Sequence, residues 1–146
     1  MHDFTPHPDA AKPELYRDLA EAASALIAGE ADTVANMANI AALVWQFVPR
    51  LNWAGFYRVA EGELVLGPFI GKPACIRIGM GQGVCGTAAQ SGAVQLVPDV
   101  HAFPGHIACD GLVIAVIDLD SPEPGRFDIE DADGIGRLAD VIAASI

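Results

Sequence analysis

Basic side chains are scarce in this sequence. Its 146 residues include 8 Lys and Arg against 19 Asp and Glu, which gives a net charge of −11 at pH 7. Such an acidic chain repels a phosphate backbone and an anionic lipid surface, so we expect no nucleic-acid partner and no membrane partner. No apolar run reaches the roughly 18 residues of a spanning helix. The segment MHDFTPHPDAAKPE also lacks the basic and apolar blocks of a signal peptide, and we expect a cytoplasmic protein.

Cysteine is also rare, and no two cysteines form a C-x-x-C pair. Structural zinc sites usually contain such a pair, which disfavours a metal centre, although His101 or His106 could complete a Cys/Cys/His set. The odd number of cysteines, three, argues against a secreted disulfide scaffold. We therefore expect a reducing compartment.

The hydrophobic pattern predicts one α+β domain with a substantial core, since 52% of the residues are apolar. We expect helices that run from Pro13 to a stop at Gly29, from the N-cap Asp32 to a stop at Pro49, over residues 84–90, and after the N-cap Asp128.

Strands are expected at residues 53–59 and 63–69, joined by a turn at Glu61-Gly62, and at residues 74–78, 93–97 and 112–119. We divide the chain into a flexible N-terminus, residues 1–12, and one domain, residues 13–146. In that domain the N-terminal and C-terminal helices pack on a central, mostly antiparallel sheet.

The three cysteines are clustered in the segments GKPACIRIG, GQGVCGTA and GHIACD, between Cys75 and Cys109. Thiol chemistry depends on the thiolate fraction and on a nearby second thiol, so this clustering suggests redox catalysis. Three inert buried thiols fit the spacing equally well. His106 would lower the pKa of Cys109 and Asp110 would raise it, and the sequence does not decide between them. Cys85 lies at the start of the short helix, where the helix dipole favours a thiolate.

Two further patterns could carry chemistry. Trp53, Gly55 and Tyr57 share one face of a strand, where two aromatic rings over a glycine would form a pocket wall or ordinary sheet core. Asp118 and Asp120 also share a face, at the end of an apolar strand. Paired carboxylates in a partly dry site separate their pKa values, so that one could donate a proton or anchor an ammonium group. Alternatively, the strand simply reaches solvent and Asp120 caps the following turn.

Taken together, the segments LNWAGFYRV, ELVLGPFIGKPACIRIGMGQGVCGTA, DVHAFPGHIACD and VIAVIDLDSPEPGRF resemble the free methionine-(R)-sulfoxide reductases, a catalytic branch of the GAF-domain family. The resemblance extends from about Tyr16 to the last residue. It implies a GAF fold and thiol-dependent reduction of free L-methionine (R)-sulfoxide to L-methionine. It also implies a sulfenic acid, an intramolecular disulfide that thioredoxin recycles, and no metal or organic cofactor.

The resemblance assigns a role to each candidate residue. It implies that Cys109 attacks the sulfoxide, that Cys75 closes a disulfide onto it, and that Cys85 is an auxiliary cysteine that can pass the disulfide toward thioredoxin. The substrate-binding residues that it implies are Trp53, Tyr57, Asp118 and Asp120. The implied partners are free methionine sulfoxide and a thioredoxin-type reductant, and pairing of two copies through the terminal helices stays open.

One departure from the family pattern follows GHIACD, where a segment with an SEIV-type stretch and a strand is missing between Asp110 and Gly111. We expect a neighbouring strand left partly unpaired, and we favour a stretch of chain absent from the printed sequence over a true deletion. The Cα atoms of Asp110 and Gly111 would then lie further apart than 3.8 Å. The alternatives to the enzyme are a non-catalytic GAF module that senses a small molecule or redox state, and a GAF domain that holds a tetrapyrrole.

Overall fold

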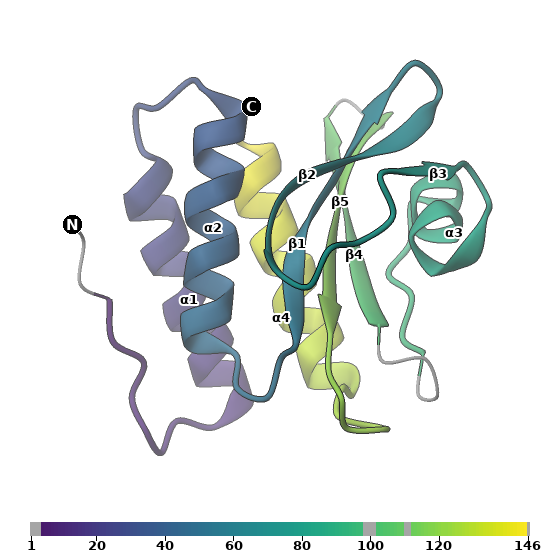
Figure 1. The fold of residues 1–146 in the computed structure, drawn as a ribbon. Coiled ribbons are helices and arrows are strands. Elements are labelled where there is room, and N and C mark those ends of the chain that lie inside the picture. The colour runs from purple at the N-terminus through teal and green to yellow at the C-terminus, as the bar shows by residue number, and fades with distance from the viewer. Residues whose placement is uncertain (1–3, 98–101, 110–111, 146) are drawn as a thin grey trace.

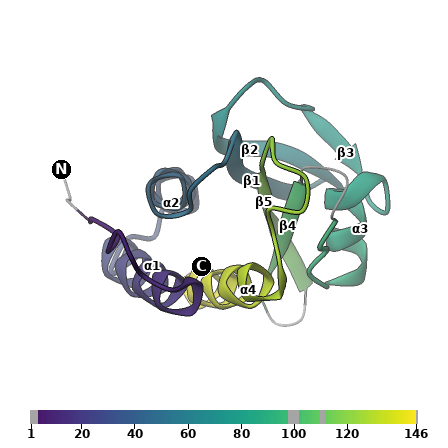
Figure 2. The same cartoon turned by 90° about the horizontal axis from the view of Figure 1, so that it is seen from below.

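The computed structural model describes residues 4–97, the backbone of 102–109, and residues 112–145. Within these residues one antiparallel sheet has the strand order β3-β2-β1-β5-β4. Helices α1, α2 and α4 cover one face of the sheet and α3 lies on the other (Figures 1 and 2). This is the α+β arrangement that the sequence predicts.

The helices follow the predicted caps and stops. The described helices are α1 (Lys12–Ile27), α2 (Thr33–Phe47), α3 (Gly83–Ser91) and α4 (Ile129–Ala143). Asp32 accepts a hydrogen bond from the N–H of Ala35 at the start of α2, at 2.8 Å. Asp128 forms a reciprocal capping box with Asp131 at the start of α4. The short polar side chains predicted as N-caps therefore satisfy amide groups that have no partner inside the helix.

Strands β1 (Trp53–Ala60) and β2 (Glu63–Gly71) form the predicted hairpin. Its turn places Glu61 at φ 54° and Gly62 at φ 83°. Two positive φ angles in a two-residue loop match the right-handed twist of the flanking strands. The third strand, β3 (Arg77–Gly79), begins later than the predicted 74–78, and all three of its residues pair with β2.

The prediction of a strand at residues 93–97 is wrong, because residues 94–97 have no regular structure. The strand lies further along, as β4 (Ala102–Cys109). The sequence Phe103-Pro104-Gly105 is typical of a loop, so the sequence alone predicts no strand there. β4 is at the edge of the sheet, where a proline is tolerated because one side of the strand needs no donors.

Strand β5 (Leu112–Asp120) pairs with β1 on one side and with β4 on the other. The prediction that the missing segment leaves a neighbouring strand unpaired is therefore wrong, since β4 occupies that position. Asp110 and Gly111 themselves lie outside the described residues, and the predicted separation of their Cα atoms stays a prediction.

The main core lies between the helices and the sheet. Its fully buried side chains include Tyr16, Leu19, Ile40, Phe56, Ile117 and Ile135. Helices α1 and α4 approach closely at Gly134, where a Cβ atom would lie 2.1 Å from Cγ of Tyr16.

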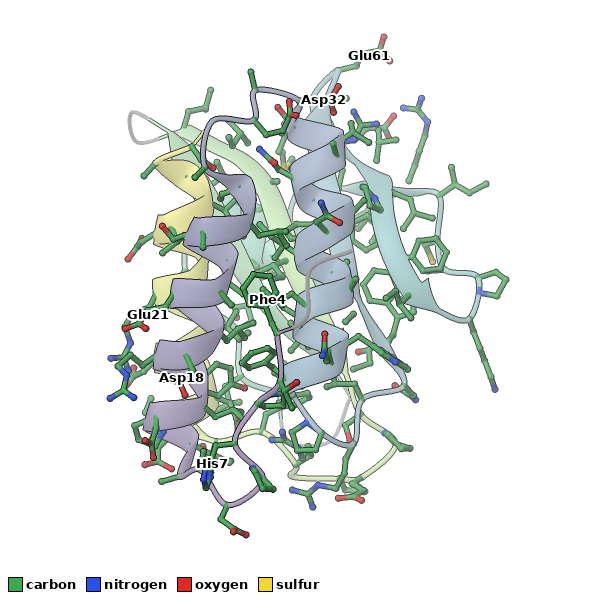
Figure 3. The ribbon with its side chains drawn as sticks, turned by 90° about the vertical axis from the view of Figure 1, so that its left-hand side faces the viewer. Phe4, His7, Asp18, Glu21, Asp32 and Glu61 are labelled. Atoms are coloured by element: carbon green, nitrogen blue, oxygen red, sulfur yellow. The ribbon has the colours of Figure 1, made fainter. Side chains whose placement is uncertain are left out.

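Ahead of α1, Phe4 packs against this core near α1 and α2, and its carbonyl accepts a hydrogen bond from Gln46 (Figure 3). Among the described residues, no helix combines the length and the hydropathy needed to cross a bilayer.

Candidate active site

The predicted aromatic wall forms on the face of the sheet that α3 covers. Strand alternation directs Trp53 and Tyr57 to this face, and their ring centroids lie 6.0 Å apart at an interplanar angle of 19°. Phe69 of β2, which the sequence analysis missed, also stacks on Trp53, with ring centroids 5.3 Å apart. The Trp53 indole N–H donates to the carbonyl of Lys72 at 3.1 Å, which fixes the orientation of the ring. The hairpin partner of WAGFY, the segment GPF, could have pointed to this third ring.

Gly55, which lies between Trp53 and Tyr57 on this face, allows a close contact between two strands. A Cβ atom at this position would lie 2.3 Å from Cβ of Phe69. The missing side chain therefore lets the Phe69 backbone approach β1 closely. The wall contains three stacked rings, and the Cβ and Cα atoms of Phe69 close the space above Gly55.

The two carboxylates at the end of β5 lie where burial favours their protonated forms. Asp118 is buried, with 6% of its surface exposed, and its Oδ1 atom has no hydrogen-bond partner among the described residues. Burial raises the pKa of Asp118 to about 6. Burial, followed by the charge of Asp118, raises the pKa of Asp120 to about 7. The end of β5 thus holds a carboxylate pair that retains protons close to neutral pH.

Cys85 contacts this pair directly. Its Sγ atom donates a hydrogen bond to Oδ2 of Asp118 at 3.3 Å, from the first turn of α3. Burial, with the adjacent Asp118 charge, raises the pKa of Cys85 far above its ordinary value. The expectation that the helix dipole favours a thiolate at Cys85 is therefore wrong, because burial and the neighbouring carboxylate outweigh the dipole.

Tyr57 links these groups to Cys75. Its hydroxyl donates to the carbonyl of Cys75 at 3.1 Å, and the Cys75 side chain itself is exposed. Burial, followed by the charges of Asp118, Cys85, Cys75 and Asp120, raises the pKa of Tyr57. Cys75, Cys85, both aspartates and the aromatic wall therefore meet around one tyrosine. Residues from β1, β5, α3 and the segment before β3 together form one site.

Comparison with known proteins agrees with this geometry. No protein-family model matches the chain. The free methionine-R-sulfoxide reductase of Escherichia coli is 45% identical over 141 residues, covering 87% of this chain and 86% of that protein. Protein ZMO0507 of Zymomonas mobilis is 49% identical, covering 90% and 91% of the two chains. The solved structure of free methionine-R-sulfoxide reductase from Neisseria meningitidis in complex with its substrate superposes with a TM-score of 0.93 at 35% identity, covering 99% and 95%. The chain belongs to the free methionine-R-sulfoxide reductase family. It is an enzyme family with the GAF fold.

The backbone of the third cysteine lies at the opposite end of β5 from the two aspartates. Cys109 ends β4 in register with Leu112, whereas Asp118 pairs with Pro104 further along the same two strands. Asp118 is six positions after Leu112 along β5, which is about 20 Å at the usual rise of a strand. The side chains of residues 98–111, including His101, His106 and Cys109, lie outside the description. The pairing of Cys75 with Cys109 therefore stays a prediction, and Cys85 is the thiol that the described structure places beside the carboxylates.

A cavity of about 590 Å³ lies far from this reductase-family site, between the segment before α1 and the end of α2. Its walls include Lys12, Arg50 and Arg126. Each of these cations already pairs with a carboxylate, so the cavity offers no free charge to an anionic ligand. The carboxylate–thiol site on the α3 face remains the candidate for chemistry. In the described residues no group of acidic, cysteine and histidine side chains has the arrangement of a metal site.

Proposed function

We propose that this chain reduces free L-methionine (R)-sulfoxide to L-methionine by thiol chemistry. The buried carboxylate pair beside the Trp53–Tyr57 wall carries the proposal. A sulfoxide becomes electrophilic at sulfur when its oxygen is protonated or hydrogen-bonded, and Asp118 or Asp120 holds a proton near neutral pH for that purpose. The ionised member of the pair suits the ammonium group of a free amino acid.

In the first proposed step, the Cys109 thiolate attacks the sulfoxide sulfur while the acid protonates the oxygen. Methionine leaves, and the oxygen is retained on Cys109 as a sulfenic acid, which means that the thiol is oxidised by two electrons and the sulfoxide reduced by two. The Cys75 thiol then condenses with the sulfenic acid, a disulfide forms and water leaves. A thioredoxin-type dithiol reduces this disulfide and becomes a disulfide itself.

Exposure of Cys75 supports its role as the resolving thiol, because the reductant must reach the disulfide from solvent. Dependence on a dithiol reductant also supports a reducing, cytoplasmic setting. The proposed cycle requires Cys109 to leave its register opposite Leu112. β4 is the strand most able to do so, since it is an edge strand with a proline and a bulge between Ile107 and Ala108.

The test is oxidation of NADPH by thioredoxin reductase and thioredoxin in the presence of methionine (R)-sulfoxide. We expect turnover with the unmodified chain and none with Cys109→Ser. Cys75→Ser should release one equivalent of methionine and then stop, with Cys109 oxidised and no intramolecular disulfide by mass spectrometry. Continued multiple turnover in Cys75→Ser would show that another thiol resolves the sulfenic acid.

The alternative is a non-catalytic GAF module that senses a small molecule or redox state. The distance in register between Cys109 and Asp118 favours it, as does the closed three-ring stack. Saturable binding of methionine sulfoxide with no methionine released, even under a strong dithiol, would support this module and contradict the enzyme.

A further inference from the structure

The contact between Cys85 and Asp118 is held by a closely fitted helix start. Gly86 follows Cys85, and a Cβ atom there would lie 2.3 Å from the carbonyl oxygen of Gly79. The N–H of Gly81 donates to the carbonyl of Gly86 at 2.8 Å, which joins the same loop to the helix from the other direction. The first turn of α3 is therefore pressed against the end of β3, and the Cys85 side chain has little freedom to move away from β5.

Asp118 depends on this thiol for its orientation. Cys85 is the side-chain donor that the described structure gives it, and it occupies Oδ2 while Oδ1 has none. Among the described residues, the other titratable groups around Asp118 are Tyr57, whose hydroxyl donates to the carbonyl of Cys75, and Asp120, which is acidic itself. Oδ2 of Asp118 accepts the hydrogen bond from Sγ of Cys85, and Oδ1 is buried without a partner among the described residues. Oδ1 is therefore the carboxyl oxygen that remains available for a hydrogen bond to the substrate.

We propose that Cys85 is a positioning residue that acts through Asp118, and that it takes no part in the disulfide cycle. As a neutral thiol it donates to Oδ2 and directs Oδ1 toward the substrate. Its strongly raised pKa agrees with this role, because a thiol that stays protonated is a dependable donor and a poor attacking group. This inference rests on the proposed reductase function, and it replaces the disulfide-relay role that the family resemblance implied for Cys85.

Two substitutions separate a hydrogen-bond donor from a redox thiol. Cys85→Ser keeps a donor and removes the sulfur, whereas Cys85→Ala removes both. We expect kcat/KM for methionine (R)-sulfoxide to fall less than about threefold in Cys85→Ser and about tenfold in Cys85→Ala, since loss of one hydrogen bond to a carboxyl group corresponds to roughly that factor. In an Asp118→Asn background, Cys85→Ala should cost at most about twofold, because the group that it positions is already gone. Thr87→Ala, on the exposed side of the same helix, is the matched control and should keep its activity.

Equal losses in Cys85→Ser and Cys85→Ala would overturn the proposal, and so would full activity in Cys85→Ala. A relay thiol would give a third pattern: a normal first turnover in both variants, with thioredoxin-dependent turnover lost in both. If the unmodified chain releases no methionine, the proposed function fails, and urea unfolding then tests the contact itself. Non-additive shifts in the urea midpoints of Cys85→Ala, Asp118→Asn and the double variant would support the contact, whereas additive shifts would contradict it.

Discussion

Two buried aspartates on opposite faces of the sheet have contrasting surroundings. Asp131, in the first turn of α4, is fully buried and accepts hydrogen bonds from Lys12 at 2.7 Å, Arg126 at 3.1 Å and the hydroxyl of Tyr16 at 2.8 Å. Asp118, on the α3 face, receives one side-chain hydrogen bond within the described residues, from the thiol of Cys85. A buried carboxylate paired with two cations ties elements together through ion pairs, whereas burial beside a thiol drives the carboxyl group of Asp118 toward its protonated form. Burial alone therefore does not distinguish an aspartate with a structural role from one suited to acid–base chemistry. The hydrogen-bond donors around the carboxyl group make that distinction.

The surroundings of the two sites extend this contrast. Near Asp131, the hydrogen bond from Lys12 lowers the pKa of Asp128 to about 2, and Arg126 lies over the ring of Phe127 at 5.1 Å. Near Asp118, the pKa values of Asp120, Tyr57 and Cys85 are all raised. The surroundings on the side of α4 stabilise negative charge, whereas those on the α3 face disfavour it. Replacement of aspartate by asparagine should therefore lower the free energy of unfolding at position 131 and, at pH 8, raise it at position 118.

The largest effect is expected for Asp131→Asn. It leaves the Arg126 guanidinium buried and without its counter-charge, and breaking a buried ion pair costs about 3–5 kcal/mol. Urea unfolding should show this loss. The folded fraction should keep the kcat of the unmodified chain, since Asp131 lies on the opposite side of the sheet from the site. A loss in kcat larger than the loss in folded protein would show that the two faces are coupled.

Asp118→Asn should have the opposite character. We expect kcat for methionine sulfoxide to fall about 100-fold, equivalent to about 2.7 kcal/mol, because a positioned acid contributes at least that factor. At pH 8, where the unmodified carboxylate is ionised against its burial, the variant should be more stable by about 1–2 kcal/mol. Loss of stability at pH 8 would mean that the ionised carboxylate has donors beyond those described.

The free energy of unfolding, measured as a function of pH, should contain contributions from both sites. The folded pKa of Asp128 is lowered to about 2, so its contribution is present above about pH 4 and is lost as the pH falls through 2. The folded pKa of Asp118 is raised to about 6, so the unfolded chain releases its proton first and stability declines as the pH rises from about 4 to 6, by about 2 kcal/mol. Stability should decline further toward pH 7, because the folded pKa of Asp120 is also raised, to about 7.

Urea midpoints measured from pH 2 to pH 8 check this curve. Asp118→Asn should flatten the decline above pH 4 and leave the acid limb, whereas Lys12→Met should weaken the acid limb and leave the decline. A decline that persists unchanged in Asp118→Asn would assign it to another group.

The sequence predicted the local parts of this structure and missed the long-range ones. Asp32 and Asp128 were identifiable because a cap depends on neighbouring backbone amides. The shared face of Trp53 and Tyr57 followed from strand alternation. The contact of Cys85 with Asp118 joins residues 33 apart, and no periodicity tells which face of the sheet α3 covers. Pro104 misled the strand assignment for a related reason: its effect depends on whether the strand lies at an edge, and that is a property of the whole sheet.

The smallest effect tests how Tyr57 serves the α3 face. Tyr57→Phe keeps the ring stacked on Trp53 and removes the hydrogen bond to the Cys75 carbonyl, which should cost about 1 kcal/mol of stability. If this bond holds the Cys75 segment near the site, formation of the disulfide should slow severalfold while the first release of methionine keeps its rate. Quenched single-turnover samples analysed by mass spectrometry separate the two steps.

Tyr16→Phe makes the same change on the other face, where it removes the hydroxyl bonded to Asp131, so it should lower stability without slowing either step. Equal slowing of disulfide formation in both variants would attribute the effect to general loosening of the fold. Slowing in Tyr57→Phe alone would show that the hydrogen bond from the Tyr57 hydroxyl positions Cys75, the proposed resolving thiol.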